Sequence, residues 1–135
     1  MEVHRDPQPS FWVVDRLEWW RTQVVEALRG AGFPVRAYGS YDDLLAMPAA
    51  AQAAPGLVFL GCAGFHPEEM ALLRELALRR WPVVVLVSSL SLRDLRQFFL
   101  AGAADVAERP RTSNHLLSLV AATSSMASLA GPQVD

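Results

Sequence analysis

Side chains able to carry out chemistry are few in this chain and stand apart from one another. It has one cysteine, Cys62, and three histidines, of which His66 lies four residues from the cysteine. A nucleophilic thiol needs a neighbouring histidine or another positive group, and a zinc ion needs a cluster of such ligands. We therefore interpret Cys62 as a buried, unreactive thiol, and we expect no metal site and no cofactor.

Neighbouring acids offer a second candidate chemistry, general acid–base catalysis by paired carboxylates. Two such pairs occur, Glu68–Glu69 and Asp42–Asp43. Both stand at the expected start of a helix, where acids complement the helix dipole. No Ser–His–Asp order and no glycine-rich phosphate loop accompanies them. We interpret both pairs as structural, and we expect no catalytic residue and no enzymatic activity.

Composition describes one folded, nearly neutral domain. Hydrophobic residues make up 52% of the 135 residues and charged residues 19%, the reverse of a disordered chain. The net charge of −2 provides no general attraction to nucleic acid or to an anionic membrane. All 12 basic residues are arginine, which excludes lysine Schiff-base chemistry and a P-loop lysine.

Location and domain limits follow from the distribution of apolar residues. A single thiol cannot form an internal disulfide, and no signal peptide or membrane-spanning run is recognisable. We therefore expect a cytoplasmic protein with no membrane insertion. Residues 1–9 are expected to form a disordered or extended N-terminus, residues 10–126 the domain, and residues 127–135 a tail or the start of a linker.

The elements that must position any site alternate between strands and helices. Two apolar runs, Leu57–Leu60 and Val83–Val87, are hydrophobic on both faces, as are central strands of a parallel sheet covered on both sides. Right-handed crossovers then give an α/β fold with a doubly wound, five-stranded parallel sheet. The expected strands are Phe11–Val14, Pro34–Ala37, Leu57–Leu60, Val83–Val87 and Ala104–Ala107.

Helices are expected between these strands. The first, Leu17–Arg29, has an apolar stripe at three- and four-residue intervals that turns Trp19 and Val25 outward. The expected stripe consists of Leu17, Trp20, Val24 and Leu28. Serine–acid pairs predict two helix starts, one at Ser40 and one at Ser91. The other helices are expected at Ser40 to Pro48, Pro67 to Arg80, Ser91 to Gly102, and from Thr112 or Ser113 to about Ser125.

Residues just after the strands are the ones to examine, because ligands of such sheets bind at the carboxyl ends of the strands. They are Asp15 and Arg16, Gly61 and Cys62, Ser88 and Ser89, and Glu108–Pro110.

These segments resemble, in order, the receiver domain of response regulators over roughly Ser10 to Ser125. Phe11–Arg16 resembles the first strand, which in the family ends in two acids, and Pro55–Gly61 resembles the run ending in the phosphoacceptor aspartate. Val83–Ser89 resembles the fourth strand with its Thr/Ser switch, and Ala101–Pro110 the fifth strand with its Lys-Pro pair. The resemblance implies a chemotaxis-regulator-like, flavodoxin-like receiver fold of strand order 2-1-3-4-5, with a cis bond before Pro110.

The chain departs from the family where phosphate chemistry takes place. Gly61 stands at the phosphoacceptor position, Arg16 at the second acid, Arg109 at the lysine and Val106 at the aromatic switch. One carboxylate, Asp15, remains of three, which is a poor site for magnesium. We interpret the chain as a degenerate pseudo-receiver with a vestigial pocket. That pocket is formed by Asp15, Arg16, Gly61, Ser88 and Arg109.

Two hypotheses concern this pocket. Arg109 is expected to pair with Asp15, because a bidentate arginine suits a carboxylate. Arg16 either points into solvent or, with Arg109 and against the negative charge of Asp15, gives a local charge of about +1 that binds an anion or an acidic side chain of a partner.

Interaction surfaces are expected at Trp19 and on the fourth helix. Leu92, Leu95 and Phe99 lie on one line of that helix, and Phe98 and Ala101 on another, so one line must be core. We place Leu95 and Phe99 with Val106 on the helix-4, strand-5, helix-5 surface that receivers use for dimers and outputs.

The function expected from these features is phosphorylation-independent signalling in a two-component system. The chain would act through protein–protein contacts, as a monomer or a homodimer, alone or as the N-terminal domain of a longer bacterial regulator. One alternative is a flavodoxin-like sensor that binds a small ligand or anion in the vestigial pocket. A second is the regulatory domain of a DNA-binding response regulator, although the net charge predicts no nucleic-acid binding by this chain.

Overall fold

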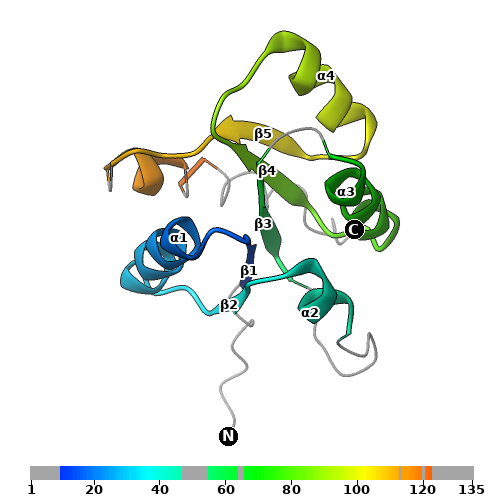
Figure 1. Ribbon diagram of the computed structural model, residues 1–135. Helices are drawn as coiled ribbons and strands as arrows, with labels where there is room; N and C mark the ends of the chain where they lie inside the picture. The colour runs from blue at the N-terminus through cyan, green and yellow to red at the C-terminus, as the bar shows by residue number, and fades with distance from the viewer. Residues whose placement is uncertain (1–9, 47–54, 64–65, 113, 120, 123–135) are drawn as a thin grey trace, which may run out of the picture.

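The computed structural model describes residues 10–46, 55–63, 66–112, 114–119 and 121–122. Strands and helices alternate along them (Figure 1). The expectations for residues 1–9, for Pro48 and for residues 127–135 lie outside the described residues. The elements are β1 (Phe11–Val14), α1 (Glu18–Gly30), β2 (Val35–Tyr38), α2 (Tyr41–Leu45), β3 (Leu57–Cys62), α3 (Pro67–Leu78), β4 (Val83–Val87), α4 (Leu92–Leu100) and β5 (Asp105–Glu108), and residues 114–119 and 121–122 are also helical.

The five strands form one parallel sheet of order β2-β1-β3-β4-β5, which confirms the predicted topology. The central strands β3 and β4 are buried at every residue, as their two-sided hydrophobicity predicts. β3 continues beyond the expected Leu60 to Cys62, so Gly61 is a strand residue paired in register with Leu86 of β4.

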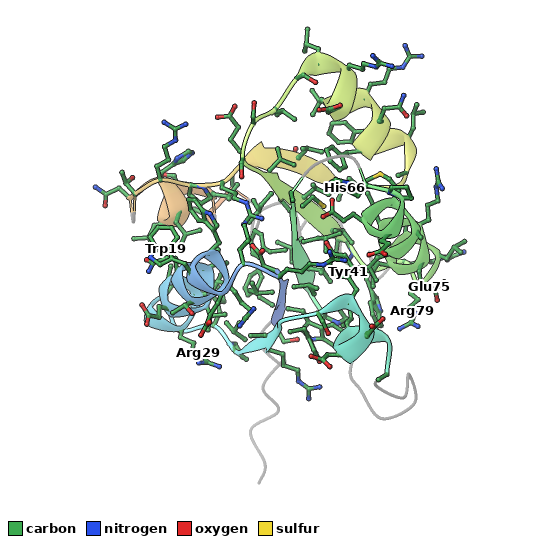
Figure 2. All side chains as sticks on the ribbon, in the orientation of Figure 1. Trp19, Arg29, Tyr41, His66, Glu75 and Arg79 are labelled. Carbon is green, nitrogen blue, oxygen red and sulfur yellow. The ribbon has the colours of Figure 1, made fainter. Side chains whose placement is uncertain are left out.

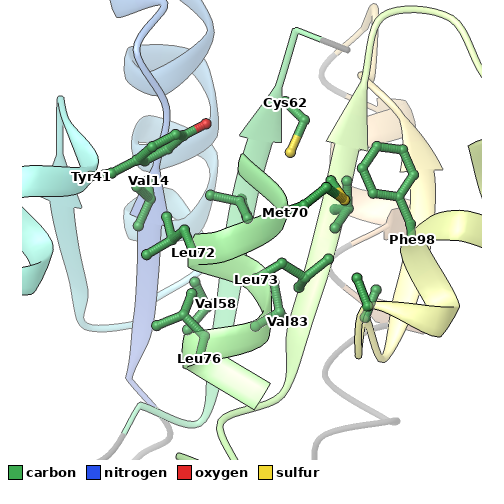
Figure 3. Packing of buried hydrophobic residues seen from close by; sticks show 14 of the residues in the cluster. Val14, Tyr41, Val58, Cys62, Met70, Leu72, Leu73, Leu76, Val83 and Phe98 are labelled. Carbon is green, nitrogen blue, oxygen red and sulfur yellow. The ribbon is translucent and has the colours of Figure 1, made fainter. Parts of the chain in front are cut away.

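Helices cover both faces of the sheet and create two hydrophobic clusters. On one face, α1 and the helical residues 114–119 pack over Phe11, Val13, Phe59 and Leu86. On the other face, α2, α3 and α4 pack over the alternate strand residues, and α3 contributes the residues at the centre of Figure 3. This layering leaves the carboxyl ends of the strands open at one edge of the sheet, where the candidate site must lie.

The buried face of α1 differs from the predicted stripe. Leu17 is 46% exposed, because it is the extended residue that precedes the helix, whereas Val25 is buried beside Val24 and Leu28. Trp19 is 61% exposed, as predicted. Apolar residues at helical spacing predict which face of a helix is buried only when the first residue of the helix is known. The predicted stripe included Leu17, which lies outside the helix.

Side-chain caps begin three helices where the sequence predicts them. The Oγ of Ser40 accepts a hydrogen bond from the Asp43 amide, and the Oγ of Ser91 accepts one from the Asp94 amide, each at 3.1 Å. Thr112, rather than Ser113, has the capping contact before residues 114–119, because its Oγ1 accepts from the His115 amide at 3.1 Å. α3 ends at Leu78, two residues before the predicted end, and Arg80 follows with a φ of 62°.

Candidate functional site

Asp15 and Arg109 meet at the carboxyl edge of the sheet. Asp15 directly follows β1 and Arg109 directly follows β5, and the backbone N–H of each donates a hydrogen bond to a carbonyl at the end of the neighbouring strand. The Nη1 of Arg109 donates to Oδ2 of Asp15, and Nη2 donates to Oδ1 at 3.3 Å. The two residues, Asp15 and Arg109, are 3% and 4% exposed, respectively. The predicted bidentate pair is therefore present, and it spans the sheet from β1 to β5.

Further contacts fix both members of this pair. The Leu17 amide donates to Oδ1 of Asp15 at 3.0 Å, and Nη1 of Arg21 donates to the Asp15 carbonyl at 2.8 Å. The Arg109 guanidinium lies 5.5 Å from the ring centroid of Trp20, a cation–π distance. Its Nε has no hydrogen-bond partner among the described residues. The peptide bond before Pro110 is trans, which corrects the cis bond implied by the resemblance.

Gly61 is the position where a side chain would meet the Asp15 carboxylate. A Cβ built on Gly61 would lie 2.2 Å from Oδ2 of Asp15 and 2.4 Å from its Cγ. Such distances are far inside van der Waals contact. The carboxylate of Asp15 therefore occupies the space that any side chain at position 61 needs. Gly61, Asp15 and Arg109 therefore form one arrangement, in which the buried pair depends on the missing side chain at position 61.

Arg16 lies outside that arrangement, on the protein surface. Its Nη2 donates to Oε2 of Glu68 at 2.8 Å, and its guanidinium lies 4.6 Å from the centroid of the Tyr41 ring. The hydrogen bond to Glu68 raises the pKa of Arg16 further above its ordinary value. Each arginine of the vestigial pocket thus faces a carboxylate, so the predicted surplus of one positive charge is absent.

Ser88 and Val106 occupy contrasting positions. Ser88 is exposed in the bend that follows β4, at the same edge as Asp15. Val106 is 8% exposed and belongs to the cluster beneath α4. The sequence expectation that Val106 lies on an interaction surface is therefore wrong, because the apolar face of β5 at this residue packs inward against α4.

This edge does not fit the divalent cation that the receiver resemblance implies. Magnesium needs several oxygen ligands, usually including one or two carboxylates. Both oxygens of Asp15 already accept from Arg109, and Gly61 offers no side-chain ligand. Within the described ranges, no group of three or more His, Cys, Asp or Glu residues could hold a metal ion. A positive guanidinium stands where a cation would be needed.

Glu69 is a buried acid that sequence reasoning missed. It is 2% exposed, its Oε1 accepts from the Ala63 amide at 3.2 Å, and its Oε2 has no hydrogen-bond partner among the described residues. A signal was present, because Glu69 shares the three- and four-residue spacing of the buried leucines of α3. Those leucines are Leu72, Leu73 and Leu76.

Tyr41 and Cys62 lie close to this acid. Burial is the main reason that the pKa of each is raised, and the nearby Glu69 carboxylate raises both further. The Tyr41 hydroxyl donates to the Gly61 carbonyl at 3.3 Å. Cys62 is a free, buried cysteine, and its raised pKa keeps the thiol protonated at neutral pH, in agreement with the interpretation of an unreactive thiol.

The expected interaction residues separate into exposed and packed groups. Phe98 and Ala101 are the core line of α4, and Leu95 is half-buried against the same cluster. Phe99 is 44% exposed, so it lies on the outer face of the helix. Trp19 packs edge-to-face on Trp20 with ring centroids 4.6 Å apart.

Comparisons with solved structures identify the fold. The chain is similar to NtrX from Brucella abortus in complex with ADP, with 26% identity over 91% of this chain and a TM-score of 0.74. It spans only 28% of the NtrX chain. It is also similar to a response regulator from Thermotoga maritima, with 24% identity, 88% of this chain and 99% of that chain covered, and a TM-score of 0.74.

A third likeness is to a CheY-like response regulator receiver domain protein from Methanospirillum hungatei. The identity is 18%, 93% of this chain and 100% of that chain are covered, and the TM-score is 0.72. No protein-family model and no curated protein sequence matches the chain. The chain thus has the response-regulator receiver fold, with a carboxyl edge built around Asp15, Gly61 and Arg109. Among the described residues, no helix is long and apolar enough to cross a membrane.

Proposed function

We propose that this chain is a pseudo-receiver, a non-enzymatic regulatory module that acts through protein contacts without being phosphorylated. One observation carries the proposal: the space for a side chain at position 61 is filled by the Asp15 carboxylate. Phosphoryl transfer to a receiver needs a carboxylate nucleophile and a bound divalent cation. Gly61 provides no nucleophile, and the buried guanidinium of Arg109 already neutralises Asp15.

Asp15 is a poor substitute nucleophile for physical reasons. An attacking carboxylate oxygen must be free to approach phosphorus, whereas both oxygens of Asp15 are engaged by Arg109 and one also accepts from the Leu17 amide. The residue is 3% exposed, so a phosphate donor would have to displace the pair to reach it. Leaving Arg109 buried and unpaired is costly. The same contacts favour one fixed state of this edge.

Protein contacts are the mode of action that the outer surface supports. On α4, Leu92 and Phe99 are exposed and stand with Arg93 and Arg96 on the side away from the core. Exposed apolar residues beside arginines are typical of interaction surfaces. The anion-sensor alternative is less well supported, because Arg109 and Arg16 are each paired with an acid.

The test is phosphorylation by acetyl phosphate with magnesium, measured by intact mass. The unmodified protein is expected to gain no phosphoryl group. Substituting aspartate at Arg16 and Gly61 alone would place a new carboxylate at position 61, in the space that the Asp15 carboxylate occupies. The gain-of-function variant is therefore R16D/G61D/R109K, which also removes the bidentate arginine.

The comparison of variants makes this test decisive. We expect R16D/G61D/R109K to become phosphorylated in a magnesium-dependent way, with R16D/R109K, which keeps Gly61, as its matched control. Circular dichroism verifies that each variant is folded. Magnesium-dependent phosphorylation of the unmodified chain would overturn the proposal.

A further inference from the structure

A groove runs along the outer face of α1 and begins near Trp20, whose ring faces the Arg109 guanidinium of the pocket just described. Its volume is about 640 Å³, and its other wall is formed by the segment after β5, including Arg111 and Leu117. The α1 residues that line it recur at helical spacing and cover the helix from its first turn to its end. Figure 2 shows Trp19 at this face, between α1 and the segment after β5. The groove is thus bounded by two helical segments of the same face of the sheet.

The two ends of this groove differ in size. Trp19 and Trp20 stand at the start of α1, and their edge-to-face packing presents a rigid aromatic projection that is 61% exposed at Trp19. The other end is lined by Ala27, Gly30 and Ala31, which leave space. A Cβ added to Gly30 would meet nothing within 4 Å. One end of the groove is therefore a knob and the other a hollow.

The two ends also differ in charge. Arg111 lies at the aromatic end, two residues beyond Arg109, whose guanidinium faces Trp20. Glu26 lies two turns further along α1, toward the hollow. Both are exposed, and neither takes part in the ion pairs of the described residues. The groove is thus positive where it is bulky and negative where it is hollow.

Such a surface is complementary to itself when rotated by half a turn. Gln23 lines the middle of the groove, and Trp19 and Ala27 lie about 6 Å from it on either side at the rise of an α-helix. A two-fold axis through Gln23 places Trp19 of one copy against Ala27 of the other. It also places Glu26 of each copy near Arg111 of the other, as an isologous interface requires.

We propose that the α1 groove binds a second copy of this chain, forming an antiparallel, two-fold dimer anchored by Trp19 and by reciprocal Glu26–Arg111 ion pairs. The partner is identified by charge and shape, since one chain supplies both the knob and the hollow, and both signs of charge. The twelve lining residues are fewer than the 20–30 residues per side, roughly, of standard interfaces, so the dimer is weak. This inference is independent of whether the domain is phosphorylated.

The test is the oligomeric state by analytical ultracentrifugation, from low micromolar to near-millimolar concentration. The unmodified chain is expected to show a reversible monomer–dimer equilibrium. E26R and R111E each place like charges together twice, so each is expected to weaken dimerisation about tenfold or more. The matched control is E18R, the same substitution on α1 outside the groove, which should dimerise normally.

Two combinations test reciprocity directly. The double variant E26R/R111E is expected to dimerise again, because both contacts regain opposite charges. Mixing the two single variants is expected to form a heterodimer. One of its contacts joins the two substituted positions and the other joins the two unchanged ones, so both contacts bring opposite charges together. A surface used for any other partner would not produce this rescue.

The apolar anchor is tested by W19A, which should also weaken the dimer about tenfold or more, with L78A as the control for loss of an exposed apolar side chain. Thermal unfolding verifies that all variants are folded. A chain that is monomeric at every concentration overturns the proposal. So does a dimer that survives E26R and W19A, or a double variant that stays monomeric.

Discussion

A buried carboxylate is stable only where its charge is balanced, and Asp15 is balanced by a residue 94 positions away in the chain. The pairing could be predicted from the sequence because both residues directly follow strands of one parallel sheet. The consequence for Gly61 could not, because it depends on which way the carboxylate points. Burial of Glu69 was also missed, since acids at helix starts usually face solvent. At the scale of single residues, the sequence indicates which side chains come into contact, but not the directions in which they point.

Removing the Arg109 guanidinium should show how much the Asp15–Arg109 pair contributes to the free energy of unfolding. R109A leaves Asp15 buried without its partner, and we expect it to lower the free energy of unfolding by about 3–5 kcal/mol. R16A removes the exposed pair with Glu68 and should have a far smaller effect, since solvent screens that pair. Urea titration measures both, and equal effects would contradict the described roles.

Filling position 61 should be equally informative. G61A places a methyl group 2.2 Å from Oδ2 of Asp15, and we expect it to lower the free energy of unfolding by about 1–3 kcal/mol or more. G30A is the matched control at the end of α1, where a Cβ meets nothing within 4 Å, so stability should stay the same or rise. An unaffected G61A would show that Asp15 moves aside easily.

Alkaline pH should destabilise the fold through Cys62. Burial raises the pKa of this thiol in the folded chain. At a pH above 9.0, the ordinary pKa of the thiol, the unfolded chain therefore loses the proton while the folded chain keeps it. Folding then becomes less favourable as pH rises, by about 1.4 kcal/mol per pH unit for one group. Urea unfolding at pH 8 and pH 10 measures the loss. C62A should show a smaller decrease, and an equal decrease would contradict this assignment.

At the scale of the elements, side-chain capping determines where a helix begins, and tertiary packing determines which face of the helix is buried. Ser40, Ser91 and Thr112 begin helices as their capping patterns predict. The buried face of α1 was only partly predictable. Leu17 was predicted to be buried and Val25 to be exposed. Leu17 instead has an extended backbone before the helix and is exposed, and Val25 is buried.

Loss of one cap should therefore weaken one helix. S91A removes the bond from the Asp94 amide, and we expect a loss of about 1 kcal/mol in the free energy of unfolding. S89A alters an exposed serine in the loop before the helix and should have little effect. If the two variants are equally stable, the Ser91 cap contributes nothing measurable.

At the scale of the whole molecule, one sheet separates two hydrophobic clusters that share its strands. Phe11 and Trp12 are adjacent in β1 yet belong to opposite clusters, so neither cluster can form without the same backbone. Alternating strand residues made this arrangement predictable, and the two-sided hydrophobicity of β3 and β4 identified the middle of the sheet. The order of the strands came from the family resemblance and the rule of right-handed crossovers.

Unfolding should consequently be a single cooperative event. We expect two probes to give the same urea midpoint at low micromolar protein. Tryptophan fluorescence reports on both faces of the sheet, through Trp12 and Trp81 on one face and Trp19 and Trp20 of α1 on the other, and circular dichroism reports on all helices. The denaturant slope should be about 1–3 kcal/mol/M. A fluorescence transition that precedes the loss of helix would contradict a single cooperative transition.

Arg109 can also be described as a cation that the chain carries with it. A dissolved metal ion occupies its site according to its concentration, whereas a tethered group has an effective concentration set by the fold alone. Chelators and magnesium starvation cannot vacate the place beside Asp15, and no loading step follows synthesis. Under the proposed function, the amount of signal would then follow the number of folded copies in the cell, so that synthesis and degradation, rather than a kinase, would be its control.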